Sequence, residues 1–339
     1  MKIAIVGASG YAGTELLRLL LDHPNFEPTV ITAHSNAGEL ITSVAPQLAK
    51  LGDRQFEAFE LAKVNACDLV FLALPHGESA ALIAQLDPNL KVIDLGADFR
   101  LTSAEKWAQY YGGTHAGTWT YGLPELPGQR EVIAKSTQVA NPGCYATSIS
   151  LAIAPALELI DIKDIVVVAA SGTTGAGRSA KVNLLGSEVM GSLSSYKFGG
   201  VHQHTPEIEE ALSRTAGSDV KISFTPILAP MPRGILSTVT AKLTATATTE
   251  TVHALYTTAY SADEFVTVLP IGQMPKTNSV VGSNHVHLQV AVDPHTNRLI
   301  VSAVIDNLGK GAASQAIQNA NLICGLPENT GLATLGLGV

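Results

Sequence analysis

A cysteine stands where a tight turn meets an apolar run. Residues 141–145 read Asn-Pro-Gly-Cys-Tyr, and residues 146–160 follow with a helical apolar pattern, so we expect Cys144 at a helix N-terminus. The partial positive charge and unpaired N–H groups of a helix start stabilise an anion and pull a cysteine pKa below about 8.5. Cys144 is therefore a candidate nucleophile, and a buried structural thiol is the alternative. The other two cysteines, Cys67 and Cys324, are expected to be packing residues.

Two histidines share a short segment that could serve the cysteine. His202 and His204 lie in a His-Gln-His-Thr-Pro-Glu run after a Gly-Gly pair. Thr205 is expected to cap a helix whose first residue is Pro206. A histidine could deprotonate Cys144 or donate a proton to a developing oxygen. Two alternatives remain open: one ring orients the other, or the pair binds metal. Further ligands in a convincing pattern are missing, so no metal is predicted.

Glycines and hydroxyls in residues 171–178 (SGTTGAGR) follow an expected strand over 165–170. Such a loop can form a backbone nest for an anion, with Arg178 as the counter-charge. Arg100 and Arg233 are further candidates to clamp a carboxylate or phosphate. The alternatives are a flexible loop and two arginines in ordinary surface ion pairs.

A glycine-rich turn connects the first expected strand to the first expected helix. It reads Gly7-Ala8-Ser9-Gly10-Tyr11-Ala12-Gly13. Glycines in this context permit a tight turn and let a pyrophosphate approach the helix N–H groups. The spacing is G-x-x-G-x-x-G rather than G-x-G-x-x-G, so an ordinary tight turn is the alternative.

The second strand is expected to end about twenty residues later, in Thr32-Ala33-His34-Ser35-Asn36. No Asp or Glu stands there to accept a ribose 2′-hydroxyl, which favours NADP over NAD. His34, Ser35 and Asn36 would then hold the 2′-phosphate, since no arginine is present. Loop length alone is the other explanation of this polar run.

The elements that carry these residues change type along the chain. Short β-branched strands alternate with helices in the first half, which predicts a parallel sheet covered on both faces; the expected elements are strands 2–6, 28–32, 68–74 and 92–95 and helices 11–22 and 78–86. Alternating segments follow, which predict a mixed or antiparallel sheet with one buried face; they are 221–227, 235–244, 285–292 and 299–305. An open α/β domain thus precedes an α+β domain, joined near residues 141–144, and a last helix over 311–324 is expected to return to the first.

Composition excludes several classes of function. The 339 residues are 46% hydrophobic and 15% charged, with a net charge of −8, so two globular domains are expected. No basic stripe or interleaved aromatic residues indicate nucleic-acid binding. The chain has no apolar stretch of membrane-spanning length, no signal segment and no paired cysteine motif, so we expect a cytoplasmic protein with no membrane partner.

Taken together, the motifs resemble those of the N-acetyl-gamma-glutamyl-phosphate reductase family, and more distantly those of aspartate-semialdehyde dehydrogenase and glyceraldehyde-3-phosphate dehydrogenase. The resemblance rests on residues 7–13, 141–145, 171–178, 202–208, 232–235 and 306–316. It implies a Rossmann-type NADP-binding domain over 1–143, completed by 308–339, and an α+β catalytic domain over 144–307. It also implies a small-molecule acyl-phosphate substrate and assembly as a homodimer or homotetramer.

The resemblance assigns roles to individual residues. Cys144 is the nucleophile and His202, favoured over His204, is the acid/base. The cofactor residues implied are Gly7, Ser9, Gly10, Tyr11, Gly13, His34, Ser35, Gly175 and Asn307, the last approaching the nicotinamide. The substrate residues implied are Arg100, Ser171, Gly172, Arg178, His204 and Arg233. Relatives often carry an arginine where this chain has His34.

The implied reaction is a step of arginine biosynthesis. N-acetyl-glutamyl 5-phosphate and NADPH give N-acetyl-glutamate 5-semialdehyde, NADP and phosphate through a thioester on Cys144. Three alternatives stay open: a reductase of the longer aminoadipyl phosphate, a Cys-His acyl hydrolase, and a redox sensor that binds NADPH without turnover. A basic rim would indicate the aminoadipyl-phosphate reductase. Absence of NADPH binding would indicate the hydrolase, and NADPH binding without turnover would indicate the sensor.

Overall fold

The computed structural model describes residues 1–338, and these form two compact units. Unit 1 contains Met1–Pro124, Gly128–Pro142 and Ala312–Leu332. Unit 2 contains Glu125–Pro127, Gly143–Gly311 and residues 333–338. The backbone passes from one unit to the other between Pro142 and Gly143, directly before Cys144. The domain limits expected from the sequence, 1–143 with 308–339 and 144–307, stay a proposal.

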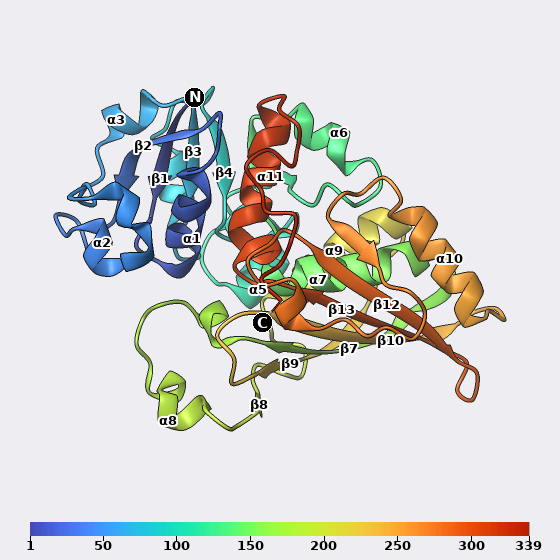
Figure 1. Cartoon of the computed structure of the whole chain (residues 1–339). Helices are drawn as coiled ribbons and strands as arrows, with labels where there is room; N and C mark the ends of the chain where they lie inside the picture. The colour runs from blue at the N-terminus through green and yellow to red at the C-terminus, as the bar shows by residue number, and fades with distance from the viewer. Residues whose placement is uncertain (339) are drawn as a thin grey trace. The chain divides into compact units, whose positions relative to one another are not determined.

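Unit 1 is built on a six-stranded sheet in the order β2-β1-β3-β4-β6-β5 (Figure 1), and every pairing in it is parallel. The strands are β1 Lys2–Val6, β2 Glu27–Thr32, β3 Leu69–Leu72, β4 Lys91–Asp94, β5 Thr120–Tyr121 and β6 Gln138–Ala140. Their side chains are mostly buried on both faces, as the near-continuous apolar runs require. The predicted parallel sheet is confirmed.

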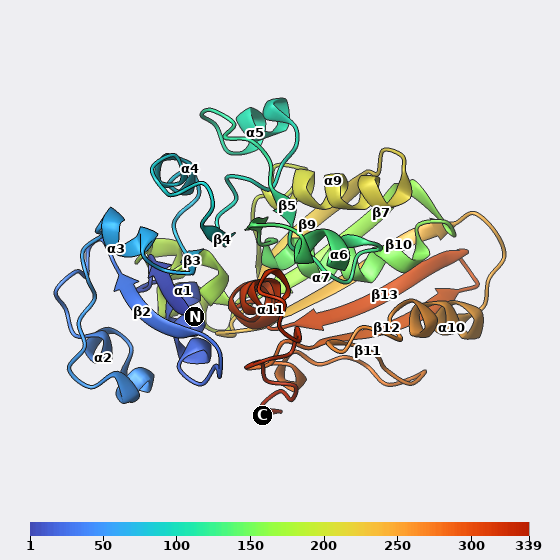
Figure 2. The same cartoon turned by 90° about the horizontal axis from the view of Figure 1, so that it is seen from above.

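Helices cover this sheet and fix where its loops lie (Figure 2). Ala4, Val6 and Val70 pack into a cluster with Val64 and Cys67, which makes Cys67 the packing residue expected. Helices α1 and α11 contact each other, α1 contacts β1 and β2, and α11 contacts β4. The helices are α1 Tyr11–Leu20, α2 Ile41–Val44, α3 Leu61–Asn65, α4 Ser79–Ile83, α5 Ala104–Tyr110, α6 Gln129–Ala134 and α11 Ser314–Ile323.

Unit 2 contains a seven-stranded mixed sheet in the order β11-β12-β13-β10-β7-β9-β8. Its centre is antiparallel, whereas β7 with β9 and β11 with β12 are parallel pairs. The strands are β7 Ile160–Ser171, β8 Ser194–Ser195, β9 Ile222–Leu228, β10 Ile235–Leu243, β11 Val266–Val268, β12 Val286–Asp293 and β13 Arg298–Ile305. Residues of β7 and β10 alternate between buried and exposed, so one face of the sheet is buried, as predicted.

Three helices of unit 2 lie along that sheet, α7 Cys144–Ile153 against β10 and β13, α9 His204–Ala216 against α7 and β9, and α10 Thr249–Ala259 against β12. The short helix α8 Gly186–Val189 packs instead with the 3-10 turn at Val182–Leu184. Two sequence expectations were wrong. Helix α7 ends at Ile153 rather than near residue 160, because Pro155 cannot continue an α-helix. Helix α9 begins at His204, after an N-cap at Gln203, so Thr205 does not cap it.

Candidate active site

In unit 1 the glycine-rich turn is shaped by close backbone packing. Gly7 has φ +88°, and a Cβ there would lie 2.5 Å from the carbonyl oxygen of Ala73. A Cβ on Gly13 would lie 2.5 Å from the carbonyl oxygen of Gly7. Both positions therefore require glycine for the strand, the turn and α1 to pack together.

Gly10 differs, since the nearest atom to an added Cβ would be 4.0 Å away. It is the N-cap of α1, and within the described chain no side chain caps that helix. The turn thus offers open space in front of a helix N-terminus, where a helix favours negative charge. The protein's own packing does not require a glycine at position 10, and the open space there would admit a pyrophosphate. The residues present fit a dinucleotide.

The end of β2 is held against this turn, because the carbonyl oxygen of Thr32 accepts the N–H groups of Gly7 and Ala8 at 3.2 and 2.9 Å. His34 and Ser35 follow as exposed residues. A carboxylate that the pattern of residues 32–36 does not include lies beside this loop, because Asn36 donates a hydrogen bond to Glu39 at 3.2 Å. The side chain of Glu39 is thus a neighbour of the loop expected to receive a 2′-phosphate.

Arg100 is buried in unit 1, with 4% of its surface exposed. Its Nε donates to the carbonyl oxygen of Asn141, and its second terminal nitrogen donates to the carbonyl oxygen of Leu95, both at 2.8 Å. Nearby, the carboxylate of Asp98 accepts the N–H groups of Gly77 and Ser79. Arg100 therefore ties together the segments that follow β4 and β6.

In unit 2, Cys144 is the first residue of α7, as the sequence predicted, and it is half-buried. Gly143 and Gly311 both approach it. A Cβ on Gly311 would lie 2.7 Å from the Cβ of Cys144. The Cβ of Cys144 is thus packed against the backbone of a π-helical turn at Gly309–Ala313, a feature that recurs at functional sites.

His204 reaches the same helix start. A Cβ on Gly143 would lie 2.4 Å from its Nε2, so only glycine leaves room for this imidazole ring beside the residue that precedes Cys144. The sequence predicted only a tight turn before Cys144. The structure adds a second reason for glycine at position 143, because a histidine from α9 occupies the adjacent space.

His202 lies next to His204, with 5.0 Å between the two ring centroids. It is buried among Tyr145, Tyr196 and Phe224, and its Nδ1 accepts the backbone N–H of His204 at 3.1 Å. Burial, followed by the nearby His204 and Lys197, lowers the pKa of His202 to about 2. His202 is therefore neutral near pH 7, and with Nδ1 accepting, its proton is on Nε2.

Glu207 is a residue for which the sequence suggested no role. Its carboxylate is buried, and Oε1 accepts the N–H of Gly143 at 2.8 Å. It follows His204 by three residues, so both side chains lie on one face of α9. One turn of α9 thus contacts the start of α7 twice, through the hydrogen bond from Gly143 to Glu207 and through the ring of His204. The three-residue spacing of His204 and Glu207 was the only feature of the sequence that indicated a shared role.

The loop over 171–178 is braced by two other segments. A Cβ on Gly172 would lie 2.8 Å from the backbone of Pro232. Thr174 donates to the carbonyl oxygen of Pro232, and Asn307 Nδ2 donates to the hydroxyl of Thr174 at 3.0 Å. The amide oxygen of Asn307 accepts the N–H of Gly234 at 2.8 Å. Asn307 therefore connects the loop over 171–178 to the segment that contains Pro232 and Gly234. A Cβ on Gly175 would lie 3.3 Å from the hydroxyl of Ser171 and 3.8 Å from Nδ2 of Asn307.

The two arginines of this region have different surroundings. Arg233 forms a two-point ion pair with Asp306, at 3.0 and 2.6 Å. Asp306 is fully buried and also accepts the N–H groups of Gly282 and Leu308. Arg178, in contrast, is exposed. Arg233 is thus held by a buried carboxylate, whereas Arg178 lies at the surface at the end of the loop.

Comparison with known proteins agrees with this geometry. The family described as semialdehyde dehydrogenase, NAD binding domain, matches residues 2–136, and semialdehyde dehydrogenase, dimerisation domain, matches residues 144–307. N-acetyl-gamma-glutamyl-phosphate reductase of Acidothermus cellulolyticus is 56% identical over 338 residues, covering 99% of this chain and 98% of the relative. The same enzyme of Salinispora arenicola is 56% identical over 339 residues, covering 99% of each chain.

The chain belongs to the N-acetyl-gamma-glutamyl-phosphate reductase family.

Solved structures support the fold of this reductase family member. Aspartate semialdehyde dehydrogenase II of Vibrio cholerae aligns with a TM-score of 0.70 at 17% identity, covering 95% of this chain and 98% of that one. Aspartate semialdehyde dehydrogenase with NADP of Candida albicans aligns with a TM-score of 0.69 at 15% identity, covering 94% and 98%. The predicted class, a Rossmann-type domain followed by an α+β domain as in the semialdehyde dehydrogenases, is confirmed.

Among residues 1–338, no three His, Cys, Asp or Glu side chains are grouped as metal ligands would be. In the same range, none of the helices combines the length and apolar character needed to cross a membrane.

Proposed function

We propose that this chain reduces N-acetyl-L-glutamyl 5-phosphate to N-acetyl-L-glutamate 5-semialdehyde and phosphate with NADPH, a step of arginine biosynthesis. Full-length identity of 56% to relatives that carry this activity in their name supports the reaction. One observation of the structure carries the chemistry: Cys144 begins a helix at a turn whose glycine makes room for the ring of His204.

In the proposed mechanism the thiolate of Cys144 attacks the carbonyl carbon of the acyl phosphate. A C–S bond forms, the C–O bond to phosphate breaks, and phosphate leaves with the electron pair to give a thioester on Cys144. The oxygen of the tetrahedral intermediate carries negative charge, and N–H groups at the start of α7 point toward such charge. The position of Cys144 at the first residue of α7 supports this assignment.

The glycine-rich turn would hold the pyrophosphate of NADP at Gly7, Ser9, Gly10, Tyr11 and Gly13. The open space at Gly10 supports this assignment. His34 and Ser35, exposed after β2, would face the 2′-phosphate, and Gly175 and Asn307 would approach the nicotinamide. When bound, NADPH supplies the hydride that reduces the thioester carbon.

The histidine pair would move the protons. The sequence favoured His202 as acid/base, but the contact of the His204 ring with Gly143 supports His204 as the ring that serves Cys144. His202 would then orient it, since its Nδ1 accepts the backbone N–H of His204 and burial keeps it neutral. His204→Asn should therefore reduce the rate of thiol alkylation by iodoacetamide more than His202→Asn does.

Substrate contacts are proposed for Ser171, Gly172 and Arg178, with the exposed guanidinium of Arg178 meeting an anionic group. The guanidinium groups of Arg100 and Arg233 bind carbonyl and carboxylate oxygens of the protein. We propose that these two arginines act on the substrate by shaping the loops around it.

The test is phosphate-dependent oxidation of N-acetylglutamate 5-semialdehyde, followed by NADPH absorbance, with aspartate semialdehyde and the aminoadipate analogue as parallel substrates. Turnover of the first alone, faster with NADP than with NAD, supports the proposal. Preference for another aldehyde would keep the chemistry and change the substrate. Thioester hydrolysis without nucleotide reduction would instead indicate an acyl hydrolase.

We also propose a cytoplasmic location and assembly as a homodimer or homotetramer. The match of residues 144–307 to a family described as a dimerisation domain supports the assembly. The three cysteines, all within the described residues, form no disulfide, which suits a reducing compartment.

A further inference from the structure

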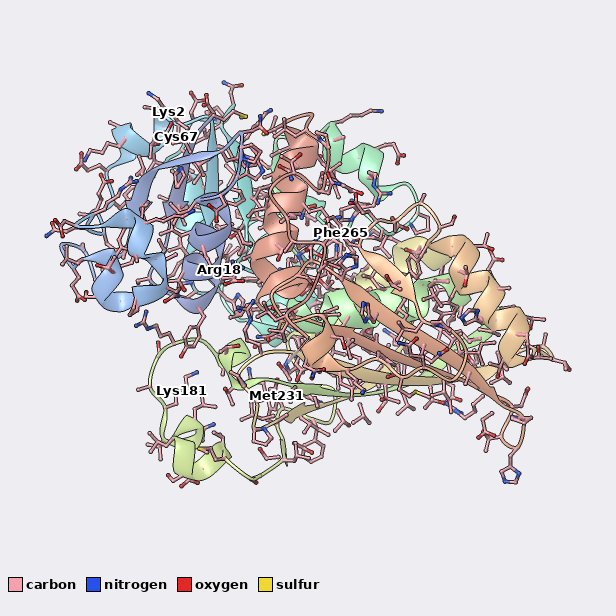
Figure 3. All side chains as sticks on the ribbon, viewed as in Figure 1. Lys2, Arg18, Cys67, Lys181, Met231 and Phe265 are labelled. Carbon is pink, nitrogen blue, oxygen red and sulfur yellow. The ribbon has the colours of Figure 1, made fainter. Side chains whose placement is uncertain are left out.

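A buried ion pair includes a residue of the π-helical turn, and the proposed mechanism gives this pair no role. The Nζ of Lys310 lies 2.5 Å from Oε1 of Glu125, and the two side chains are 0% and 1% exposed. The ring of Phe265, labelled in Figure 3, has its centroid 5.9 Å from the same Nζ. Glu125–Pro127 belongs to unit 2, although the segments before and after it belong to unit 1. Both charges are therefore buried within unit 2.

Stability alone does not explain a buried ion pair. Removing two charges from water costs free energy that their attraction only partly offsets, and apolar side chains of similar size often stabilise a protein equally well. Two apolar side chains could thus fill the space of Lys310 and Glu125. The ion pair differs from an apolar contact because an ammonium group and a carboxylate attract each other at a defined distance, which restricts the backbone that carries them.

The backbone around Lys310 has an irregular hydrogen bond. The N–H of Gly311 donates to the carbonyl oxygen of Asp306 at 2.9 Å, five residues earlier in the chain. In an α-helix it would donate to residue 307, four residues earlier. Helix α11 begins directly after this turn, at Ser314, so an α-helical continuation is the competing arrangement. A change to that arrangement would shift Gly311 relative to the residues before it.

The residues on either side of Lys310 contact other parts of the site. Asp306 and Asn307 are hydrogen-bonded to the segments around residues 233 and 174. Gly311 packs against the Cβ of Cys144. A shift of register in this short stretch of chain would disturb these contacts together. Lys310 lies within the stretch, and its ion pair connects the stretch to a point outside both segments and the cysteine.

We infer that Lys310 is a positioning residue: its ion pair with Glu125 holds the π-helical turn in register and thereby keeps Gly311 against Cys144. The inference rests on the proposed function, because Cys144 is the proposed nucleophile. It assigns Lys310 no contact with the substrate or the cofactor.

The first variant combines Lys310→Met with Glu125→Leu, which replaces both charges by apolar side chains of similar size, so the chain should remain folded in thermal unfolding. Deuterium exchange of the Gly311 amide, followed by NMR without substrate, should become at least about tenfold faster, because its hydrogen bond to Asp306 opens more readily. The kcat for phosphate-dependent semialdehyde oxidation should fall at least about tenfold, since a displacement of about 1 Å at an active site costs about a hundredfold. The Kd of NADPH should stay unchanged, because the glycine-rich turn is intact.

The matched control removes a different ion pair of unit 2. Arg298→Met with Asp164→Leu breaks the pair between Arg298 and Asp164, whose charged atoms are 2.9 Å apart. Arg298 is the first residue of β13, whereas the π-helical turn follows the end of that strand. The control variant should leave the exchange rate of the Gly311 amide and kcat unchanged.

A second variant, Glu125→Asp, keeps both charges but shortens the carboxylate side chain by one CH2 group. Lys310 must then move to keep its partner, and the turn that carries it must move as well. The exchange rate of the Gly311 amide should therefore rise and kcat should fall, as in the double variant. If the double variant does not fold, Glu125→Asp decides by the same two measurements.

Unchanged kcat in the folded double variant would show that the pair only fills space and would overturn the inference. A lower kcat with an unchanged exchange rate would overturn it as well, because the turn would not connect the ion pair to Cys144. Turnover by the unmodified chain tests the proposed reaction separately. If that chain oxidises none of the tested aldehydes, the proposed reaction is refuted, and the exchange rates alone decide whether the ion pair holds the turn.

Discussion

Gly143→Ala is the sharpest perturbation of the proposed site, because it adds one methyl group in the space that the His204 ring occupies, next to Cys144 in the chain. The added Cβ would lie 2.4 Å from His204 Nε2, and ordinary contact begins at 3.4 Å. The ring must therefore retreat by the difference, 3.4 − 2.4 = about 1 Å. The backbone itself tolerates alanine, since Gly143 has φ −69° and ψ 151°.

A displacement of about 1 Å in a catalytic group lowers turnover on the order of a hundredfold. We therefore expect kcat/KM for phosphate-dependent semialdehyde oxidation to fall by about that factor, or about 2.7 kcal/mol of transition-state stabilisation. The rate of alkylation of Cys144 by iodoacetamide should fall in the same variant, because the ring no longer lies against the helix start.

The matched control is the same substitution in a His204→Ala chain, where the obstructing ring is absent. There the added methyl group should change neither the alkylation rate nor the thermal midpoint by a measurable amount. In the chain with His204 intact, Gly143→Ala should also lower the free energy of unfolding by about 1–3 kcal/mol, as overpacking does. A Gly143→Ala enzyme with kcat/KM within threefold of wild type would refute the reasoning, because His204 would then not need its place beside Gly143.

Three further predictions concern the same molecule. Cys144→Ser should abolish reduction while leaving NADPH binding intact, measured by nucleotide fluorescence, because the serine hydroxyl ionises poorly at neutral pH; substantial turnover would exclude the covalent route. Glu207→Ala should lower the free energy of unfolding in urea by about 2 kcal/mol, because the N–H of Gly143 loses a buried charged acceptor. Glu207→Gln keeps an acceptor oxygen and should keep most of that free energy; equal losses in the two variants would contradict this account. Burial raises the pKa of Asp94 to about 6, above its unfolded value near 3.8, so the native state holds the extra proton and stability should fall as pH rises from about 4 to about 6, by up to about 3 kcal/mol. Asp94→Asn should remove that slope in urea titrations at pH 4, 5, 6 and 7, and an unchanged slope would place the titrating group elsewhere.

The sequence predicted the parts of the site that depend on local pattern. A turn followed by an apolar run placed Cys144 at a helix start, and alternation of strand and helix predicted the parallel sheet of unit 1. The end of α7 was missed because Pro155 was not weighed against the apolar run that continues beyond it. The sequence therefore predicted a structural feature only where the residues of a single segment determine it.

Contacts between distant segments were not predictable in this way. The hydrogen bond from Gly143 to Glu207 spans 64 residues, and the ion pair of Arg233 with Asp306 spans 73. An arginine that binds substrate at the surface and an arginine in a buried ion pair look alike in sequence, because each is only an arginine next to a glycine-containing segment. The cap of α9 differs from the prediction for a local reason, because Nδ1 of His202 accepts the backbone N–H of His204 where a hydroxyl was expected to cap the helix.

The open space at Gly10 has a consequence for separating the two halves of the proposed reaction. The protein's own atoms leave room for a methyl group there, with the nearest atom 4.0 Å from an added Cβ, and the backbone angles of φ −75° and ψ 169° suit alanine. Gly10→Ala should therefore fold normally yet obstruct a pyrophosphate. Such a chain would accept the acyl group on Cys144 and then stop, holding a thioester that mass spectrometry can weigh. Gly10, which the packing of the fold does not require and which we propose meets the cofactor, thus gives a means of arresting the proposed reaction between its two chemical steps.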